Sequence, residues 1–234
     1  MFRRILSLTR VLPALGALLA AMPASADVWR VTADLDPVGV QNVMDTAVYG
    51  DTVLVEPGEY MMLTVRNGIH LLGEKGPEET IFRYGRVVLT VNEADSNTVI
   101  EGITVDGIKA SEGIIVAEHS NARIRNCIIK NGWVGVRSAF AAPVVENCTI
   151  RKCQRGIFLS ECEGLITGND IRECVTAIEI FSSSPRVFRN VLTGNSLGIF
   201  VDEHSNAVIG GSLATANRVF KNPGGAIKNR GLVK

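Results

Sequence analysis

The sequence predicts an all-β fold, a single-stranded parallel β-helix built as a solenoid of about eight turns of about 21 residues. The first observation is a fixed spacing: Ile124, Val145, Ile166, Val187 and Val208 each open a similar block and lie 21 residues apart. The second is that apolar and polar residues alternate over three or four positions in each block, which is typical of a strand. The third is that no block holds an apolar run long enough for a helix. A regular repeat of this size indicates a solenoid.

Residues at equivalent positions of successive blocks should stack in such a solenoid, because each strand pairs with its counterpart one turn on, about 4.8 Å away. Three apolar columns should therefore fill the core. The columns are Ile100, Ile124, Val145, Ile166, Val187 and Val208, then Val105, Ile129, Ile150, Ile171, Leu192 and Leu213, and finally Ile114, Val136, Ile157, Ile178, Ile199 and Phe220.

Residues 1–26 are predicted to be an export signal. Three arginines precede the apolar run of residues 11–22, and Ala24-Ser25-Ala26 fits a cleavage site. The apolar run is too short to span a bilayer as a helix. We therefore expect a protein of residues 27–234 that is exported to the periplasm or the extracellular space, with no membrane anchor left after cleavage.

The charge balance argues against nucleic acid as a partner. Removal of the signal takes three of the 24 basic residues and leaves the 24 acidic residues in place. A slightly acidic protein does not attract polyanions in general. The chain has three histidines in all, which excludes a histidine-rich metal site, and we expect no metal and no cofactor.

The domain should begin with an N-terminal strand and a capping helix within residues 27–50. Asp36 is the expected N-cap, Pro37 lies in the first turn and Gly50 is the expected stop. The helix would cover the open end of the coil.

Three further parts complete the domain of residues 27–234. Residues 51–98 should form the first turns, residues 99–220 the regular repeats and residues 221–234 the C-terminal end, with one possible last strand near residues 225–227. The exposed C-terminal end could associate with a second copy.

The early segments also carry a specific resemblance. Gly50-Asp-Thr-Val53, Pro57-Gly-Glu-Tyr60 and the stretch Leu72–Glu78 resemble the amino-terminal end of the pectin-lyase-like right-handed parallel β-helix superfamily. The later Asn-x-x-Ile and Gly-Ile copies resemble the generic repeats of that superfamily. The resemblance covers essentially the whole chain after the signal and implies a right-handed coil. It implies no single activity, since the superfamily includes lyases, hydrolases, esterases, epimerases, tailspikes and accessory proteins.

The catalytic motifs of the superfamily are missing. The Asp-Asp pair and Gly-His-Gly of polygalacturonases are absent, as are the Trp-Ile-Asp-His stretch of pectate lyases and the Asp-Pro-His-Asp core of alginate epimerases. The Gly-x-Tyr-x-Glu turn of pectin methylesterases reads Gly58-Glu-Tyr-Met-Met62. The resemblance therefore matches no specific enzyme family.

Two outward rows are the candidate functional residues. The first row lies on the wall that, by resemblance, carries active sites, and it contains Ile115, Arg137, Phe158, Glu179, Phe200 and Lys221. Its phenyl rings could stack on sugars while its cations hold acidic groups, and Glu179 is its only candidate acid or base. The second row, Lys130, Arg151 and Arg172, is either a site for an acidic polymer or a solvated ladder balanced by Asp170 and Glu173.

Three functions remain open from the sequence. The leading hypothesis is an exported β-helix protein that binds an extended carbohydrate on its outer wall. The first alternative is a periplasmic scaffold or accessory protein that contacts another protein, similar in build to the β-helix protein that helps mature nitrous oxide reductase. The second alternative is a diverged polysaccharide lyase, in which Glu179 would be the base.

The five cysteines are predicted to occupy inward turns as free thiols. Cys127 and Cys148 share a register that asparagines continue at 169 and 190, and Cys153 and Cys174 share another that Asn195 continues. Small polar side chains at such corners satisfy backbone groups. Export would allow either pair to oxidise, but parallel side-chain directions would strain the disulfide. Cys162 has no predicted column partner and no adjacent base.

Overall fold

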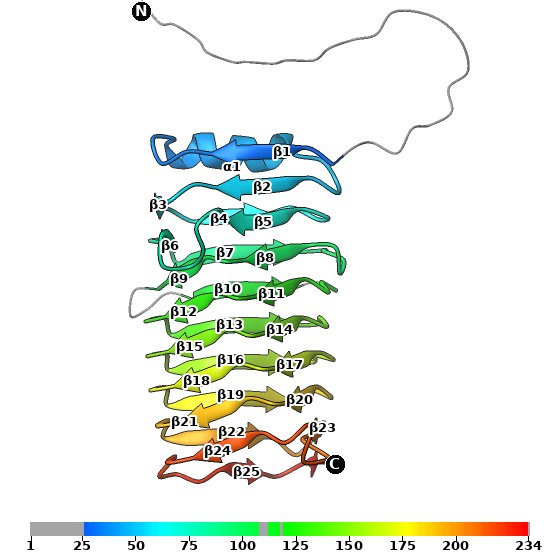
Figure 1. The fold of residues 1–234 in the computed structure, drawn as a ribbon. Coiled ribbons are helices and arrows are strands. Elements are labelled where there is room, and N and C mark those ends of the chain that lie inside the picture. Colours follow the sequence, from blue (N-terminus) through cyan, green and yellow to red (C-terminus); the bar gives the residue numbers. More distant parts are fainter. Residues whose placement is uncertain (1–25, 108–111, 118, 234) are drawn as a thin grey trace, which may run out of the picture.

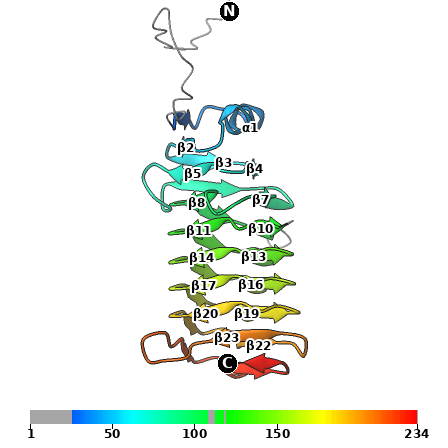
Figure 2. The ribbon, with the colours of Figure 1, turned by 90° about the vertical axis from the view of Figure 1, so that its right-hand side faces the viewer.

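The chain winds into a parallel β-helix of about nine turns in the computed structural model, which describes residues 26–107, 112–117 and 119–233 (Figure 1). The predicted export signal, residues 1–26, lies outside the described residues apart from Ala26. The solenoid is straight, with the helix at one end and the C-terminal strands at the other (Figures 1 and 2).

Three parallel sheets, here named A, B and C, run along the solenoid axis. Sheet A contains β1 (Val28–Val31), β2 (Thr52–Val55), β5 (His70–Gly73), β8 (Val99–Glu101), β11 (Arg123–Arg125), β14 (Val144–Glu146), β17 (Leu165–Thr167), β20 (Arg186–Phe188), β23 (Asn206–Ile209) and β26 (Leu232–Val233). Sheet B contains β3 (Gly58–Tyr60), β6 (Thr80–Arg83), β9 (Thr104–Asp106), β12 (Ile128–Lys130), β15 (Thr149–Arg151), β18 (Asp170–Arg172), β21 (Val191–Thr193) and β24 (Arg218–Phe220). Sheet C contains β4 (Leu63–Val65), β7 (Val87–Asn92), β10 (Glu112–Ala117), β13 (Val134–Ala139), β16 (Arg155–Ser160), β19 (Thr176–Phe181), β22 (Leu197–Val201) and β25 (Ile227–Asn229).

The predicted core columns are confirmed from residue 100 to residue 199. Equivalent residues pair one turn apart, as Ile124 does with Val145 on sheet A and Ile157 does with Ile178 on sheet C, and all four are fully buried. Burial of one such aliphatic side chain contributes about 1.5–3 kcal/mol. The stacked columns are therefore the main source of stability.

The columns fail in the last turn, where the predicted places of Val208, Leu213 and Phe220 are wrong. Leu213 is fully exposed and Phe220 is 41% exposed. The residues that continue the three columns are instead Ile209 below Val187, Val219 below Leu192 and Ile227 below Ile199.

An enlarged turn explains the shift at Leu213 and Phe220, whereas the one-residue shift from Val208 to Ile209 arises before that turn, between Val201 and Asn206. Gly210 and Gly211 have positive φ angles of 78° and 123°, and Ser212 and Thr215 close the turn with a backbone hydrogen bond of 3.1 Å. The step between stacked corner residues grows from 21 to 27 residues, as from Asn190 to Asn217. The chain then adds β24, β25 and β26. The sequence predicted a single last strand, whereas these three strands form most of a further turn.

Helix α1 (Pro37–Thr46) caps the N-terminal end of the solenoid (Figure 1). The Asp36 side chain accepts a hydrogen bond of 2.7 Å from the Gly39 N–H, which confirms the predicted N-cap. Val40 and Met44 are buried against the first turn. The predicted stop at Gly50 is wrong, since the helix ends at Thr46 and the backbone at Ala47 is extended. No helix in the described part of the chain has the length and hydropathy of a membrane span.

The buried carboxylate of Asp51 fastens the first strand to this end. It accepts hydrogen bonds from Asp27 N at 2.8 Å, Trp29 Nε1 at 2.7 Å and Val48 N at 2.9 Å. Burial acts to raise the pKa of Asp51, but the donated hydrogen bonds outweigh it, and the pKa lies below its usual value.

Each turn bends at corners that share one local design. A residue with positive φ makes the bend, as at Asn126 and Asn147 between sheets A and B or at Lys152 and Glu173 between sheets B and C. The next residue is buried and stacks on its counterpart one turn on. Asparagine tolerates this left-handed conformation better than most residues, so its recurrence in the repeat has a conformational reason.

The stacked corner residues form the predicted ladders. Asn169 N–H donates to Asn190 Oδ1 at 3.0 Å, and Asn190 N–H donates to Asn217 Oδ1 at 3.0 Å. The five cysteines are buried and free, as the sequence predicted. Cys162 does have column partners, contrary to prediction: its N–H donates to Ser183 Oγ at 2.9 Å, and the Ser183 N–H donates to Ser205 Oγ at 3.1 Å.

Candidate functional site

The first outward row lies on sheet C and keeps the predicted order for five of its six residues. Ile115 pairs with Arg137, Arg137 with Phe158, Phe158 with Glu179, and Glu179 with Phe200. Lys221 is not part of this row, because the enlarged last turn carries it to the corner after β24, with a φ of 55°. Lys228 of β25 takes its place below Phe200.

Glu179 is held by a neighbouring cation. Arg155 Nε lies 2.9 Å from Glu179 Oε2, and the Glu179 side chain is 16% exposed. Glu112 and Arg137 form a similar pair at 2.7 Å on the preceding strands. The Glu179 carboxylate is thus engaged through Oε2 in an ion pair within the protein.

A continuous aromatic row crosses three strands of sheet C. The ring centroids of Phe158 and Phe181 are 5.6 Å apart, and those of Phe181 and Phe200 are 5.3 Å apart. Phe181 was missed from the sequence, although it lies two positions beyond Glu179 and therefore faces outward by strand alternation. We call Phe158, Phe181 and Phe200 the phenyl row.

Guanidinium groups lie over two of the three rings of the phenyl row, Phe158 and Phe200. The Cζ atom of Arg155 lies 5.0 Å from the Phe158 ring centroid, and that of Arg137 lies 6.0 Å from the same ring. Arg230 lies 5.9 Å from the Phe200 centroid. Such cation–π contacts hold both the rings and the cations in place. The surface combines half-buried phenyl rings with guanidinium groups.

A hollow of about 420 Å³ lies beside this surface, at strands β7, β10 and β13, which precede the strands of the phenyl row in sheet C. Trp133, which precedes β13, is 47% exposed. The other residues lining the hollow are Arg86, Val87, Glu112, Ile115 and Arg137. We call this feature the Trp133 hollow. The sequence offered a single signal for it, a tryptophan in a corner where the repeat otherwise places small or polar residues.

The second outward row is confirmed but lies on another wall. Lys130, Arg151 and Arg172 pair in register on sheet B. Asp106 is 3.5 Å from Lys130, and Asp170 is 3.4 Å from Arg172. The eight candidate residues therefore divide between two faces and a corner and do not form one site.

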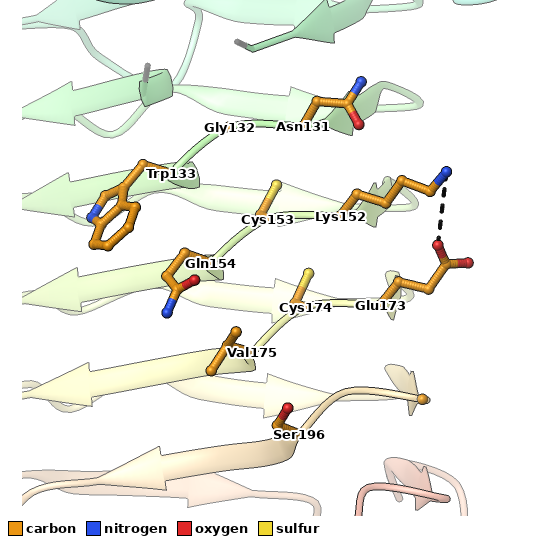
Figure 3. Close-up of a pocket in the computed structure, with 11 residues that line it drawn as sticks. Asn131, Gly132, Trp133, Lys152, Cys153, Gln154, Glu173, Cys174, Val175 and Ser196 are labelled. Carbon is orange, nitrogen blue, oxygen red and sulfur yellow. Dashed lines mark ion pairs between the residues drawn. The ribbon is translucent and has the colours of Figure 1, made fainter. Parts of the chain in front are cut away.

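A second hollow, of about 510 Å³, opens between sheets B and C, and two cysteines line it (Figure 3). Cys153 and Cys174 stand on successive turns with their sulfur atoms pointing in the same direction. Lys152 and Glu173, the bend residues beside them, form an ion pair of 4.0 Å. Interaction between the two neighbouring thiols lowers the pKa of Cys153 and, together with burial, raises the pKa of Cys174. We call this feature the dithiol hollow.

A comparison with protein families assigns the chain. The family model described as periplasmic copper-binding protein (NosD) matches residues 44–223. The chain belongs to the NosD family. This NosD family member has the fold expected from the sequence, that of the pectin-lyase-like right-handed β-helix proteins. No curated protein matches it in sequence.

Three solved structures with a similar course of the chain are distant from this NosD family member in sequence. Pectate lyase Pel9A is 11% identical, with a TM-score of 0.46 over 88% of this chain and 74% of the other. The A-module of the Azotobacter vinelandii mannuronan C-5 epimerase AlgE4 is 15% identical, with 0.42 over 79% and 76%. The alginate lyase from Paenibacillus sp. str. FPU-7 is 14% identical, with 0.37 over 89% and 99%. At such similarity none of their activities transfers.

The family description names copper, so the donor atoms of this NosD family member matter. The described residues contain no group of three or more His, Cys, Asp or Glu side chains placed to hold a metal ion. Soft thiolate ligands select copper(I), whereas copper(II) takes nitrogen and oxygen donors in a square-planar arrangement. Stacked thiols such as Cys153 and Cys174 therefore fit copper(I) better than copper(II).

Proposed function

We propose that the protein is an exported accessory protein of the NosD family that binds a partner protein with the outer face of sheet C. The observation that carries this proposal is the phenyl row with its covering arginines. Aromatic and arginine side chains are the residues most enriched in the energetic centres of protein interfaces. Here they form one surface across neighbouring strands.

The covered rings favour a protein over a sugar. A sugar stacks on the open face of an aromatic ring, but Arg155 lies over Phe158 and Arg230 lies near Phe200. A protein surface can bind to ring edges and to guanidinium groups at once, since its carboxylates and apolar side chains match both.

The charge of the face favours an acidic partner. Four carboxylates, those of Glu112 and Glu179 on the strands and those of Glu161 and Asp202 at the corner that also holds Arg230, stand among five cations. The cations on and beside the outer face of sheet C are Arg86, Arg137, Arg155, Lys228 and Arg230. Unbalanced positive charge would speed encounter with an acidic surface and make binding weaken as salt is added.

The family supports an accessory role. Its description names a periplasmic, copper-binding protein and no polysaccharide-modifying activity. The export signal predicted for residues 1–26 agrees with a periplasmic location. Glu179, the candidate base of a diverged lyase, is bound to Arg155.

Site-specific crosslinking in cells tests the proposal. A photo-crosslinking amino acid in place of Phe181 should form an adduct with one exported protein, and the same substitution at Thr167, outward on sheet A, should not. With the partner purified, Phe181→Ala should weaken binding about tenfold, since a central aromatic residue contributes more than 1 kcal/mol. Equal adducts from both positions, or none from Phe181, would contradict the proposal.

A carbohydrate ligand is the second candidate, and the Trp133 hollow favours it. The exposed indole of Trp133 lies in a hollow that Arg86 and Arg137 also line, which suits a sugar with an acidic group. A thermal-shift screen with acidic polysaccharides, followed by Trp133→Ala, tests this binding. A shift that Trp133→Ala removes and Phe181→Ala leaves would support the carbohydrate and not the protein partner. Absence of unsaturated uronate products in the same samples would exclude a lyase.

A further inference from the structure

We propose that Cys153 and Cys174 bind one copper(I) ion between their sulfur atoms, in the dithiol hollow. This site uses other residues than the outer face of sheet C, and it can be present whether or not that face binds a partner.

Backbone pairing sets the two cysteines one turn apart. The Val175 N–H donates to the Cys153 carbonyl oxygen at 3.2 Å, so the Cys174 corner lies directly below the Cys153 corner. Each sulfur contacts the carbonyl two residues earlier, Cys153 Sγ with Arg151 O at 3.5 Å and Cys174 Sγ with Arg172 O at 3.4 Å. The two side chains therefore have matching orientations, with one sulfur above the other (Figure 3).

The distance between successive turns of the solenoid fits an ion that is bound by two ligands. Successive strands are about 4.8 Å apart. A metal–sulfur bond of a first-row ion is about 2.3 Å long, so two such bonds in line span about 4.6 Å. An ion between the sulfurs would need little movement of either corner.

Binding exchanges two protons for the ion. Two neutral thiols and Cu⁺ give a bis-thiolate complex of charge −1 and release two H⁺, with no change of oxidation state. The cation of Lys152 lines the same hollow and would balance the added negative charge. Its ion pair with Glu173, at 4.0 Å and about half exposed, is loose enough to allow this.

The second stacked pair serves as a built-in comparison. Cys127 and Cys148 repeat the same arrangement at the corner between sheets A and B, but their sulfurs also approach core carbonyl oxygens, those of Ile100 and Ile124, at 3.7 Å. They are 2% and 1% exposed. Cys153 and Cys174 are each 4% exposed and line a hollow open to solvent, through which an ion can enter.

Copper(I) titration of the reduced, oxygen-free protein against a chromophoric chelator tests the site. We expect one ion per chain with a sulfur-to-copper absorption band in the ultraviolet. Cys153→Ser and Cys174→Ser should each weaken binding by more than the roughly 10–100-fold that follows loss of an outer-shell partner. Cys127→Ser and Cys148→Ser are the matched controls and should bind as the unaltered protein does.

Three results would overturn the proposal. The first is unchanged affinity in a Cys153→Ser/Cys174→Ser double variant whose thermal unfolding shows that it is folded. The second is an equal loss of binding in the Cys127→Ser/Cys148→Ser control. The third is a Cys153–Cys174 disulfide, found by alkylation and mass spectrometry in protein isolated from the periplasm without reductant.

Discussion

The Nε atom of Arg155 lies 2.9 Å from the Glu179 carboxylate on the neighbouring strand, while its guanidinium carbon lies 5.0 Å from the centre of the Phe158 ring. One side chain therefore neutralises the single acid of the outward row and covers the face of an aromatic ring. This double contact supports the protein interface that we propose for the outer face of sheet C.

A double-mutant cycle should detect this contact. We expect Arg155→Ala and Glu179→Gln to show a coupling of about 0.5–1 kcal/mol in urea unfolding, a modest value because the pair is partly exposed. Each single variant should remain folded. Strictly additive effects would show that the two side chains do not interact in solution.

The asparagine ladder should be far more sensitive than the surface. Asn190→Ala removes a fully buried amide that donates to Ile166 O at 2.9 Å and accepts from the Asn169 N–H at 3.0 Å. Each buried group left without a partner costs about 1–3 kcal/mol, and we expect a loss of about 2–4 kcal/mol in the free energy of unfolding.

Asn206→Ala is the matched control for the ladder. Asn206 is exposed, and its backbone N–H still donates to Ser183 O at 3.0 Å after the substitution. We expect its unfolding midpoint to stay close to that of the unaltered protein. Equal losses in the two variants would contradict a special role of the ladder.

Stability should fall in acid partly because of Asp51. Its hydrogen-bond donors lower its pKa in the folded protein despite burial, so the unfolded chain binds more protons as the pH falls. The contribution is complete above the unfolded pKa of about 3.9 and is lost as the pH falls through the folded value. Thermal unfolding between pH 7 and pH 3 should show a smaller acid loss in Asp51→Asn than in the unaltered protein, from a lower starting stability. A parallel shift of the two profiles would contradict this assignment.

The C-terminal end should support association of two copies. Ile227 and Leu232 of its last strands are 43% and 67% exposed, and strand edges at an uncovered end are available for pairing. We expect light scattering to show a dimer that grows with concentration and that Leu232→Asp weakens. A monomer at high concentration would refute the expectation that the sequence raised.

The sequence predicted the core because one rule governs it. From Ile100 to Ile199 the period fixes both the pairing partner and the inward direction of each residue, so columns such as Ile124 and Val145 follow directly. The rule failed when glycines at 210 and 211 enlarged one turn, which moved Lys221 off its row and Phe220 out of the core. A regular period cannot predict a turn whose length departs from that period.

The residues of the candidate surface were harder to predict from the 21-residue repeat. Phe181 and Trp133 matter because of contacts between turns, with Phe158 and Phe200 in one case and with the lining of a hollow in the other. Such contacts depend on side-chain rotamers and on neighbouring strands. The repeat could state which residues share a wall, but it could not state that Arg155 would cover a ring and bind an acid.

The hydrogen bond from Asp27 N to the buried Asp51 carboxylate links the fold to the processing of the chain. Cleavage after Ala26, at the predicted site, would replace an amide donor with a terminal ammonium group, and a charged donor strengthens such a bond. The precursor could assemble the same strands but not this ion pair. The ion pair would therefore form only after a protease has removed the export signal.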